Sequence, residues 1–196
     1  MELDNLFQRE IILASQSPRR RHLLKQMGFS NVRIVSIDVD ESLDCDIKPE
    51  EAAEFLARRK SEVYAESLSK DSILITADTT VVMGNAILNK PENAIKAAQT
   101  LNVLSGKTHK VITACCLRTN KAIKSFSQTS IVKFKNLTEE EISYYIQNYA
   151  PYDKAGAYGI QEWIGLTGIE KIEGDFYTIM GLPCQRLFEE IKKITS

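Results

Sequence analysis

Asp78 lies within SILITADTTVVM, residues 72–83, a run of apolar and β-branched residues typical of a buried strand. A carboxylate there is costly unless it is paired, hydrogen-bonded or bound to a metal, so Asp78 is the first catalytic candidate. Glu41, in the acidic segment 38–46, is a candidate partner. Two such carboxylates could hold Mg²⁺ or Mn²⁺ together with substrate phosphates and water. The structural alternatives are an aspartate at a strand end and a solvated run of charge.

Serine and arginine side chains gather in SQSPRRR, residues 15–21, at the start of a predicted helix. Ser17 is a natural N-cap, and Pro18 suits the first helical position. Each arginine in this first turn would cost about 0.3–1 kcal/mol against the helix dipole unless an anion is present. Free N–H groups, hydroxyls and arginines form a cradle for a polyphosphate. A capped helix with solvated arginines is the alternative.

Two lysines and one loop complete the candidate residues. Lys60 lies in a predicted helix, and Lys90 lies ahead of a proline-started helix, where a loop residue can point into a cleft. The loop DKAGAYGIQ, residues 153–161, contains glycines that would let backbone approach a ligand closely. It ends at Gln161, whose amide offers a donor and an acceptor to a nucleobase edge. Surface lysines and a structural turn are the alternatives, and we expect Trp163 to pack rather than to line a cleft.

The elements that must position these residues mix strands and helices without strict alternation. We therefore expect an α/β protein with an elongated mixed sheet flanked by helices, rather than a regular doubly wound one. The pattern predicts strands at 11–14, 32–39, 72–77 with an interruption at 78–80 and resumption at 81–83, 86–88, 110–118, 123–134, 168–172 and 176–180. It predicts helices from Pro18, from 49–51 through Leu68, over 91–104, over 138–148 behind a capping box at Thr138, and after 181–183.

Length and composition favour one globular domain over the 196 residues, with two lobes. Hydrophobic residues make up 43% and charged residues 26%, which argues against disorder. The net charge of −1 gives no general attraction to nucleic acid or anionic membranes, so an anion site must be local. The sequence has no run of eighteen apolar residues and no basic-then-apolar leader, and we expect a soluble, cytoplasmic protein.

The cysteines form no CxxC pair, and we expect all four to be reduced thiols: Cys45, Cys115, Cys116 and Cys184. Adjacent cysteines on a strand point to opposite faces, which suits core filling better than metal binding. With only His22 and His109, we do not expect a histidine-rich zinc site.

Five motifs follow one another in an order that resembles the Maf family of nucleoside triphosphate pyrophosphatases. They are ASQSPRR at 14–20, ADTTVV at 77–82, LNKPENAIKAAQTLNVLSGKTHKVITA at 88–114, DKAGAYGIQ at 153–161 and IEGDFYTIMGLP at 172–183. The resemblance covers nearly the whole chain. It implies an α/β fold related to the inosine triphosphatase group, with an elongated sheet and two lobes around a cleft. It also implies hydrolysis of a nucleoside triphosphate to the monophosphate and pyrophosphate with a divalent cation, Mg²⁺ or Mn²⁺ and, as a third option, Co²⁺.

The resemblance also implies a role for each matching residue. Asp78 would be the general base, and Glu41 would assist it in holding the metal. The positions that match the family's phosphate-binding residues are Ser15, Arg19, Lys60 and Lys90. The positions that match its specificity residues are Arg20, Thr79 and Gln161, and all three resemble the branch that acts on dTTP and UTP.

The sequence departs from the family pattern at a few positions. Glu162 and Trp163 replace small, glycine-rich residues, Thr178 stands where many members have asparagine or serine, and Thr76 stands where glycine is common. None of these removes a proposed catalytic group.

The expected partner is therefore a nucleoside triphosphate, with no stable nucleic acid and no membrane, and the family suggests a homodimer. The alternative function is a nucleotide-binding regulator of cell division or septum formation that uses the same site without turnover. The set Asp78, Glu41 and Lys90 favours the enzyme, because a pure binder needs no base beside the phosphates.

Overall fold

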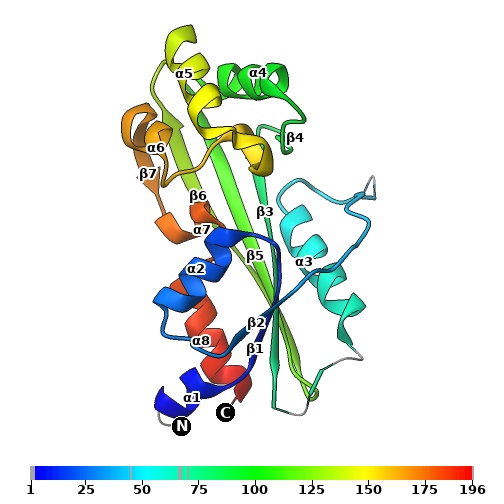
Figure 1. Cartoon of the computed structure of the whole chain (residues 1–196). Helices are drawn as coiled ribbons and strands as arrows, with labels where there is room; N and C mark the ends of the chain where they lie inside the picture. The colour runs from blue at the N-terminus through cyan, green and yellow to red at the C-terminus, as the bar shows by residue number, and fades with distance from the viewer. Residues whose placement is uncertain (1–2, 45, 66–67, 70, 196) are drawn as a thin grey trace. The chain divides into compact units, whose positions relative to one another are not determined.

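The computed structural model describes residues 3–44, 46–65, 68–69 and 71–195 (Figure 1). Its strands are β1 (Ile11–Ala14), β2 (Val32–Val35), β3 (Ile73–Met83), β4 (Ala86–Ile87), β5 (Thr108–Arg118), β6 (Ile123–Phe134) and β7 (Ile169–Glu173). Its helices are α1 (Leu3–Gln8), α2 (Pro18–Gln26), α3 (Ala52–Val63), α4 (Ala94–Leu104), α5 (Glu139–Tyr149), α6 (Trp163–Gly168), α7 (Phe176–Met180) and α8 (Cys184–Thr195). Two 3₁₀ turns, η2 (Pro151–Asp153) and η3 (Ala155–Ala157), follow α5.

In the described part of the chain, the strands form one seven-stranded sheet in the order β2-β1-β3-β5-β6-β7, with β4 paired to β3. Strand β1 is parallel to both β2 and β3, whereas β4 and β7 pair antiparallel with β3 and β6. Figure 1 shows the long strands β3, β5 and β6 running together through the sheet. The predicted α/β class with a mixed sheet flanked by helices is therefore confirmed.

The described residues form two compact units. The first contains the residues up to Asp78, residues 113–128 and the residues from Gly181 onward, and the second contains residues 79–112 and 129–180. Strands β3, β5 and β6 each contribute residues to both units. The description of the chain as a single domain with two lobes stays a prediction.

The core of the first unit lies around the parallel strands. All four residues of β1 are buried, as expected for a strand with neighbours on both sides and helices over its faces. Ile12, Ala14 and Leu74 form one buried cluster, against which partly buried side chains from the following segments pack. This packing fixes the end of β1, which Ser15 follows, and the first half of β3, which leads to Asp78.

The core of the second unit is built by α4, α5 and the strands next to them. Leu101, Leu104 and Phe134 are fully buried, and Tyr145 on α5 is buried with them. The predicted capping box at the start of α5 is confirmed: the Thr138 hydroxyl accepts from the Glu141 amide, and the Glu141 carboxylate accepts from the Thr138 amide. Trp163 is partly buried against this core, so its expected packing role is confirmed.

Two predictions about strands are wrong. Strand β3 continues through residues 78–80 without interruption, because β-branched Thr79 and Thr80 suit a strand and the Asp78 carboxylate is paired. Residues 176–180 form helix α7 instead of a strand. Asp175 begins this helix, because its carboxylate accepts from both the amide and the hydroxyl of Thr178, each at 2.7 Å.

Other differences lie at element ends. Helix α3 ends at Val63 rather than Leu68, β2 ends at Val35, and α4 begins after Asn93, whose side chain accepts from the Lys96 amide at 3.0 Å. The sequence pattern also missed α1, the two 3₁₀ turns and α6.

The described cysteines agree with the expectation of free thiols. Cys115 and Cys116 are buried on β5, Cys184 is partly buried, and none of the three is in a disulfide; Cys45 lies outside the described residues. Burial raises the pKa of the Cys115 thiol to about 12. None of the described helices has the length and apolar character needed to cross a membrane.

Candidate functional site

Three predicted site residues meet in the first unit. The Lys60 ammonium lies 2.6 Å from Asp78 Oδ1 and 2.7 Å from Glu41 Oε1. The side chains of Lys60 and Asp78 are each 14% exposed, whereas that of Glu41 is 51% exposed. Lys60 therefore lies between two carboxylates, at the last turn of α3, beside the middle of β3.

The buried hydroxyl of Thr76 fixes α3 against β3. It donates to the Ala57 carbonyl at 2.6 Å. Ala57 lies about one helical turn before Lys60 on α3, and Thr76 lies two residues before Asp78 on β3. A glycine at position 76 would have no such hydrogen bond. The departure from the family pattern at Thr76 thus has a structural reason in this chain.

Arg59 fixes the segment that carries Glu41. Its Nη1 donates to the carbonyls of Asp40 and Ser42 at 3.0 and 2.8 Å, on either side of Glu41. The Asp40 carboxylate in turn accepts from the amide and hydroxyl of Ser42, and these hydrogen bonds lower its pKa. The sequence did not indicate Arg59, because helix spacing alone does not show which loop its side chain reaches.

The donor set at this point suits a hard divalent cation. Two carboxylate oxygens converge on one positively charged atom, and Mg²⁺ and Mn²⁺ prefer such oxygen ligands, completed by phosphate and water. Lys60 occupies the position that a cation between these carboxylates would take. Among the residues that the structure describes, no group of three or more His, Cys, Asp or Glu side chains could hold a metal ion.

The predicted phosphate turn forms as expected at its helix cap. The Ser17 hydroxyl accepts from the Arg20 amide, and the Ser15 hydroxyl accepts from the Ser17 amide at 3.2 Å. Ser15 is thus held at the end of β1, and Arg19 lies partly exposed in the first turn of α2. Both belong to the first unit, with Asp78.

Arg20 connects three segments of the first unit. Its guanidinium donates to the Ser15 hydroxyl at 3.1 Å, to the Ala77 carbonyl at 2.9 Å and to the Gly181 carbonyl at 2.8 Å. Burial lowers the pKa of Arg20, and the nearby Asp78 carboxylate opposes that shift. The structure therefore shows Arg20 positioning Ser15 and the residue before Asp78, and its role in base specificity stays a prediction.

The remaining predicted residues belong to the second unit. Thr79 directly follows Asp78 in β3, Lys90 is exposed between β4 and α4, and Gln161 is exposed beside α6. The structure thus brings Lys60, Asp78 and Glu41 together, and Ser15 with Arg20. It assigns the other three residues to a different unit.

The glycines of the loop 153–161 do not face open space. A Cβ at Gly156 would lie 3.0 Å from the Val81 side chain, and one at Gly159 would lie within 3 Å of the Glu162 carboxylate. The space beside these two glycines, which we expected a ligand to approach, is therefore filled by side chains of the protein itself. Gly156 also has a φ of +70°, which favours glycine at this position.

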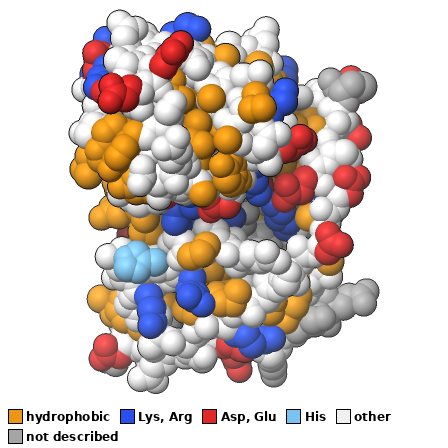
Figure 2. All heavy atoms as spheres, turned by 45° about the horizontal axis from the view of Figure 1, so that its top comes forward, with side chains coloured by type: hydrophobic (Ala, Val, Ile, Leu, Met, Phe, Trp, Pro, Cys, Tyr) orange, Lys and Arg blue, Asp and Glu red, His pale blue; other side chains and the backbone are white. Residues whose placement is uncertain are grey.

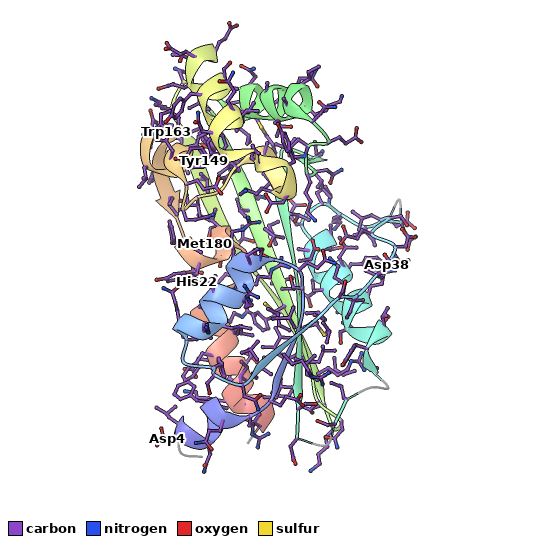
Figure 3. All side chains as sticks on the ribbon, viewed as in Figure 1. Asp4, His22, Asp38, Tyr149, Trp163 and Met180 are labelled. Carbon is purple, nitrogen blue, oxygen red and sulfur yellow. The ribbon has the colours of Figure 1, made fainter. Side chains whose placement is uncertain are left out.

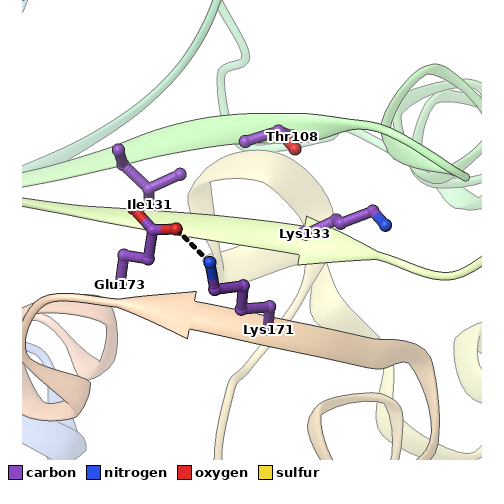
Figure 4. Close-up of a pocket in the computed structure, with 5 residues that line it drawn as sticks. All are labelled: Thr108, Ile131, Lys133, Lys171 and Glu173. Atoms are coloured by element: carbon purple, nitrogen blue, oxygen red, sulfur yellow. Dashed lines mark hydrogen bonds and ion pairs between the residues drawn. The ribbon is translucent and has the colours of Figure 1, made fainter.

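A shallow pocket on the sheet of the second unit contains none of the predicted residues (Figure 4). It is lined by Thr108, Ile131, Lys133, Lys171 and Glu173. Its positive charges are balanced, because Lys171 pairs with Glu173 and Lys133 pairs with Glu170 at 2.7 Å. This pocket offers no unbalanced charge for a triphosphate.

The surface agrees with the small net charge. On the face shown in Figure 2, lysine and arginine side chains are scattered among acidic and hydrophobic ones. His22 lies on the exposed side of α2 (Figure 3), whereas His109 is buried in the second unit.

A comparison with models of known protein families gives a match over nearly the whole chain. A family model described as "Maf-like protein" matches residues 10–194. The chain belongs to the Maf-like family. The resemblance inferred from the five ordered motifs is therefore confirmed.

Relatives of this Maf-like chain match it over their full length. A dTTP/UTP pyrophosphatase from Bacteroides thetaiotaomicron is 47% identical over 192 residues, which cover 98% of this chain and 100% of the relative. A dTTP/UTP pyrophosphatase from Porphyromonas gingivalis is 45% identical, with 97% and 96% covered.

Similarity to a solved structure is weaker. The structure of a nucleoside-triphosphatase / dITP/XTP pyrophosphatase from Mycobacterium abscessus covers 95% of this Maf-like chain and 97% of its own, at 15% identity and a TM-score of 0.40.

Proposed function

We propose that this Maf-like protein is a nucleoside triphosphate pyrophosphatase that hydrolyses dTTP and UTP to the monophosphate and pyrophosphate with a divalent cation. The observation that carries the proposal is the full-length similarity to dTTP/UTP pyrophosphatases, at 47% identity to the relative from Bacteroides thetaiotaomicron. The contacts of Lys60 with Asp78 and Glu41 support it, because they bring the proposed base, a second carboxylate that could bind a cation and a positively charged group together.

Asp78 is the proposed general base. Its Oδ1 is held by Lys60, and a carboxylate has a second oxygen that can accept a proton from water. The water oxygen then forms a bond to the α-phosphorus while the bond from that phosphorus to the bridging oxygen breaks. Pyrophosphate leaves, and the water proton remains on Asp78.

Glu41 and Asp78 would together hold the divalent cation. When bound, the cation neutralises charge on the phosphates and on the leaving pyrophosphate. With Glu41 and Asp78 engaged by the cation, the Lys60 ammonium would be available to bind a phosphate oxygen. Ser15 and Arg19 at the start of α2, and Lys90, are the other proposed phosphate ligands.

Three residues are proposed to select the base. Gln161 offers both an acceptor and a donor to the edge of uracil or thymine. Thr79 follows the catalytic aspartate in β3, and Arg20 holds the turn with Ser15. Together they account for the preference proposed for dTTP and UTP.

The test is pyrophosphate release from dTTP, UTP, CTP, 7-methyl-GTP, ITP and GTP, with Mg²⁺, Mn²⁺, Co²⁺ or a chelator. We expect cation-dependent turnover that is highest for dTTP and UTP. Asp78→Asn should fold normally and lose at least about a hundredfold in kcat, since it removes the base. Asp71→Asn, at an exposed aspartate before β3, is the matched control and should keep normal turnover.

Other outcomes would change the conclusion in different ways. Near-normal turnover by Asp78→Asn would remove Asp78 as the base. Preference for a purine would keep the enzyme and overturn the specificity assignment. Tight nucleotide binding without turnover of any substrate would overturn the proposed reaction and favour a nucleotide-responsive regulator.

A further inference from the structure

The residue proposed to read the base lies in a closed turn. The Glu162 amide donates to the Gly159 carbonyl at 3.0 Å, and Gln161 lies within this turn with its side chain exposed. An exposed side chain on a free loop would lose much of its binding free energy to ordering, whereas one on a fixed turn would not. The contacts around the turn show how it is fixed.

One phenol hydroxyl holds both ends of the turn. Tyr145, fully buried on α5, accepts from the Gly159 amide at 3.0 Å and donates to the Glu162 carboxylate. Burial and the Glu162 carboxylate both raise the pKa of Tyr145, so the hydroxyl keeps the proton that it donates.

The Glu162 carboxylate lies directly against Gly159. A Cβ at that position would come within 2.7–2.9 Å of the carboxylate atoms. With the Glu162 carboxylate in this position, a side chain at residue 159 would overlap it, so residue 159 has to be glycine. The same carboxylate is 3.2 Å from the Lys154 ammonium, whose side chain is 8% exposed.

Glu162 also orients the amide of Gln161. The Gln161 Nε2 donates to Glu162 Oε1 at 3.4 Å. An ionised carboxylate only accepts hydrogen bonds, so the NH₂ side of the amide must face it. The Gln161 carbonyl oxygen then points away from the carboxylate, and it can accept from a ring N–H.

We propose that Tyr145 and Glu162 are positioning residues that fix Gln161 with its amide oxygen toward the nucleobase. This selects bases with a ring N–H at position 3, as uracil and thymine have, and rejects cytosine, whose N3 is an acceptor. The inference rests on the proposed function, since it assigns the base preference of that same site. It also gives Glu162, a departure from the family pattern, a role in this chain.

The decisive variant is Tyr145→Phe, which keeps the buried ring and removes only the hydroxyl. Its kcat/KM for UTP, dTTP and CTP is compared with wild type at saturating Mg²⁺. We expect the preference for UTP over CTP to fall about tenfold, the size of one hydrogen bond, through a higher KM for UTP. We expect kcat to stay within about twofold, because the base lies away from the bond that breaks.

A double variant separates positioning from loss of fold. Gln161→Ala should lose the same preference, and Tyr145→Phe added to it should cause no further loss, because Tyr145 acts through Gln161. Glu162→Ala should behave like Tyr145→Phe, whereas Glu162→Gln keeps an oxygen for the hydroxyl and should restore part of the preference. Thermal melting of each variant shows whether the fold is kept.

Tyr158→Phe is the matched control. It also removes a buried phenol hydroxyl, but that hydroxyl is bound to His109 Nε2 at 2.8 Å and does not touch the turn. It should keep the preference for UTP over CTP even if it melts at a lower temperature.

Two results would overturn the inference, and they can be told apart. If the wild type hydrolyses UTP while folded Tyr145→Phe and Glu162→Ala keep its preference over CTP, the positioning role is wrong and the proposed function stands. If the wild type hydrolyses no pyrimidine triphosphate, the proposed function fails and the inference fails with it.

Discussion

Lys60 is the residue on which the charge balance of the site depends. Its ammonium contacts both Asp78 and Glu41, so the two carboxylates are neutralised in part without any metal. The divalent cation proposed to bind here would compete with it for the same oxygens. Nucleotide phosphates would favour the exchange, because they would offer the ammonium new partners.

Removing that ammonium should therefore strengthen metal binding in the absence of nucleotide. We expect Lys60→Met to bind Mn²⁺ about tenfold or more tightly than wild type, as followed by Mn²⁺ electron paramagnetic resonance, since one opposing charge is lost beside two carboxylates. Turnover of UTP should fall in the same variant. Lys171→Met, at an exposed lysine of the second unit, is the control and should leave Mn²⁺ affinity unchanged. An unchanged affinity in Lys60→Met would show that the ammonium does not compete with the metal.

At the scale of elements, helix α7 depends on one carboxylate. Asp175 accepts from the amide and hydroxyl of Thr178, and its backbone is bound to the buried Ser130 hydroxyl on both sides, at 2.9 Å each. The residues after it, Phe176 to Met180, are of types that are common in strands. The cap therefore decides between helix and strand.

We expect Asp175→Ala to destabilise the protein by about 0.5–2 kcal/mol, the usual cost of losing an N-cap. For a chain of this size the melting temperature should fall by roughly 1–8 °C. Asp175→Asn keeps a capping oxygen and should lose clearly less, as measured by thermal melting of both variants side by side. Equal losses in the two variants would show that the carboxylate charge, and not the cap, is what matters.

The elements that the sequence predicts well are those fixed by local signals. The apolar run of β1, the Ser17 and Thr138 caps and the turn between β3 and β4 all lie where their residues predict. Strand β3 was predicted with a break because Asp78 is polar, and the contact that keeps it in the strand comes from Lys60, eighteen residues earlier in the sequence. Local patterns cannot show such a contact.

The same limit applies to the site. The polar residue in an apolar run and the resemblance to the Maf family indicated Asp78, Glu41 and Lys60, and the structure brings these three together. The sequence did not indicate the positioning roles of Arg59, Thr76 or Tyr145, because each role is defined by a partner on another element. Residues of this kind are found only from three-dimensional contacts.

At the scale of the whole molecule, buried His109 makes stability depend on pH. Its Nε2 is bound to the Tyr158 hydroxyl and its ring stacks on Phe134 with centroids 5.7 Å apart. Burial lowers the pKa of His109 from 6.5 to about 4. Between these values the unfolded chain binds a proton that the folded chain does not, so stability falls as the pH falls from about 6.5 to about 4.

The loss should approach about 3 kcal/mol at the acid end of that range. Urea unfolding at steps between neutral pH and about pH 4 measures it as a slope of free energy against pH. His109→Gln should flatten the slope, and His22→Gln, at an exposed histidine of α2, should leave it as in wild type. A slope that is identical in wild type and His109→Gln would assign the acid sensitivity to other groups.

The first unit is assembled from three separate stretches of sequence, and the last of them begins at Gly181. On a ribosome, every residue of the second unit, 79–112 and 129–180, is made before α8. The turn that presents Gln161 can thus form while the carbonyl of Gly181, which Arg20 requires, has not yet been added. The turn proposed to recognise a base is therefore synthesised before the last stretch of the first unit, and Arg20 cannot donate to the Gly181 carbonyl until that stretch has been added.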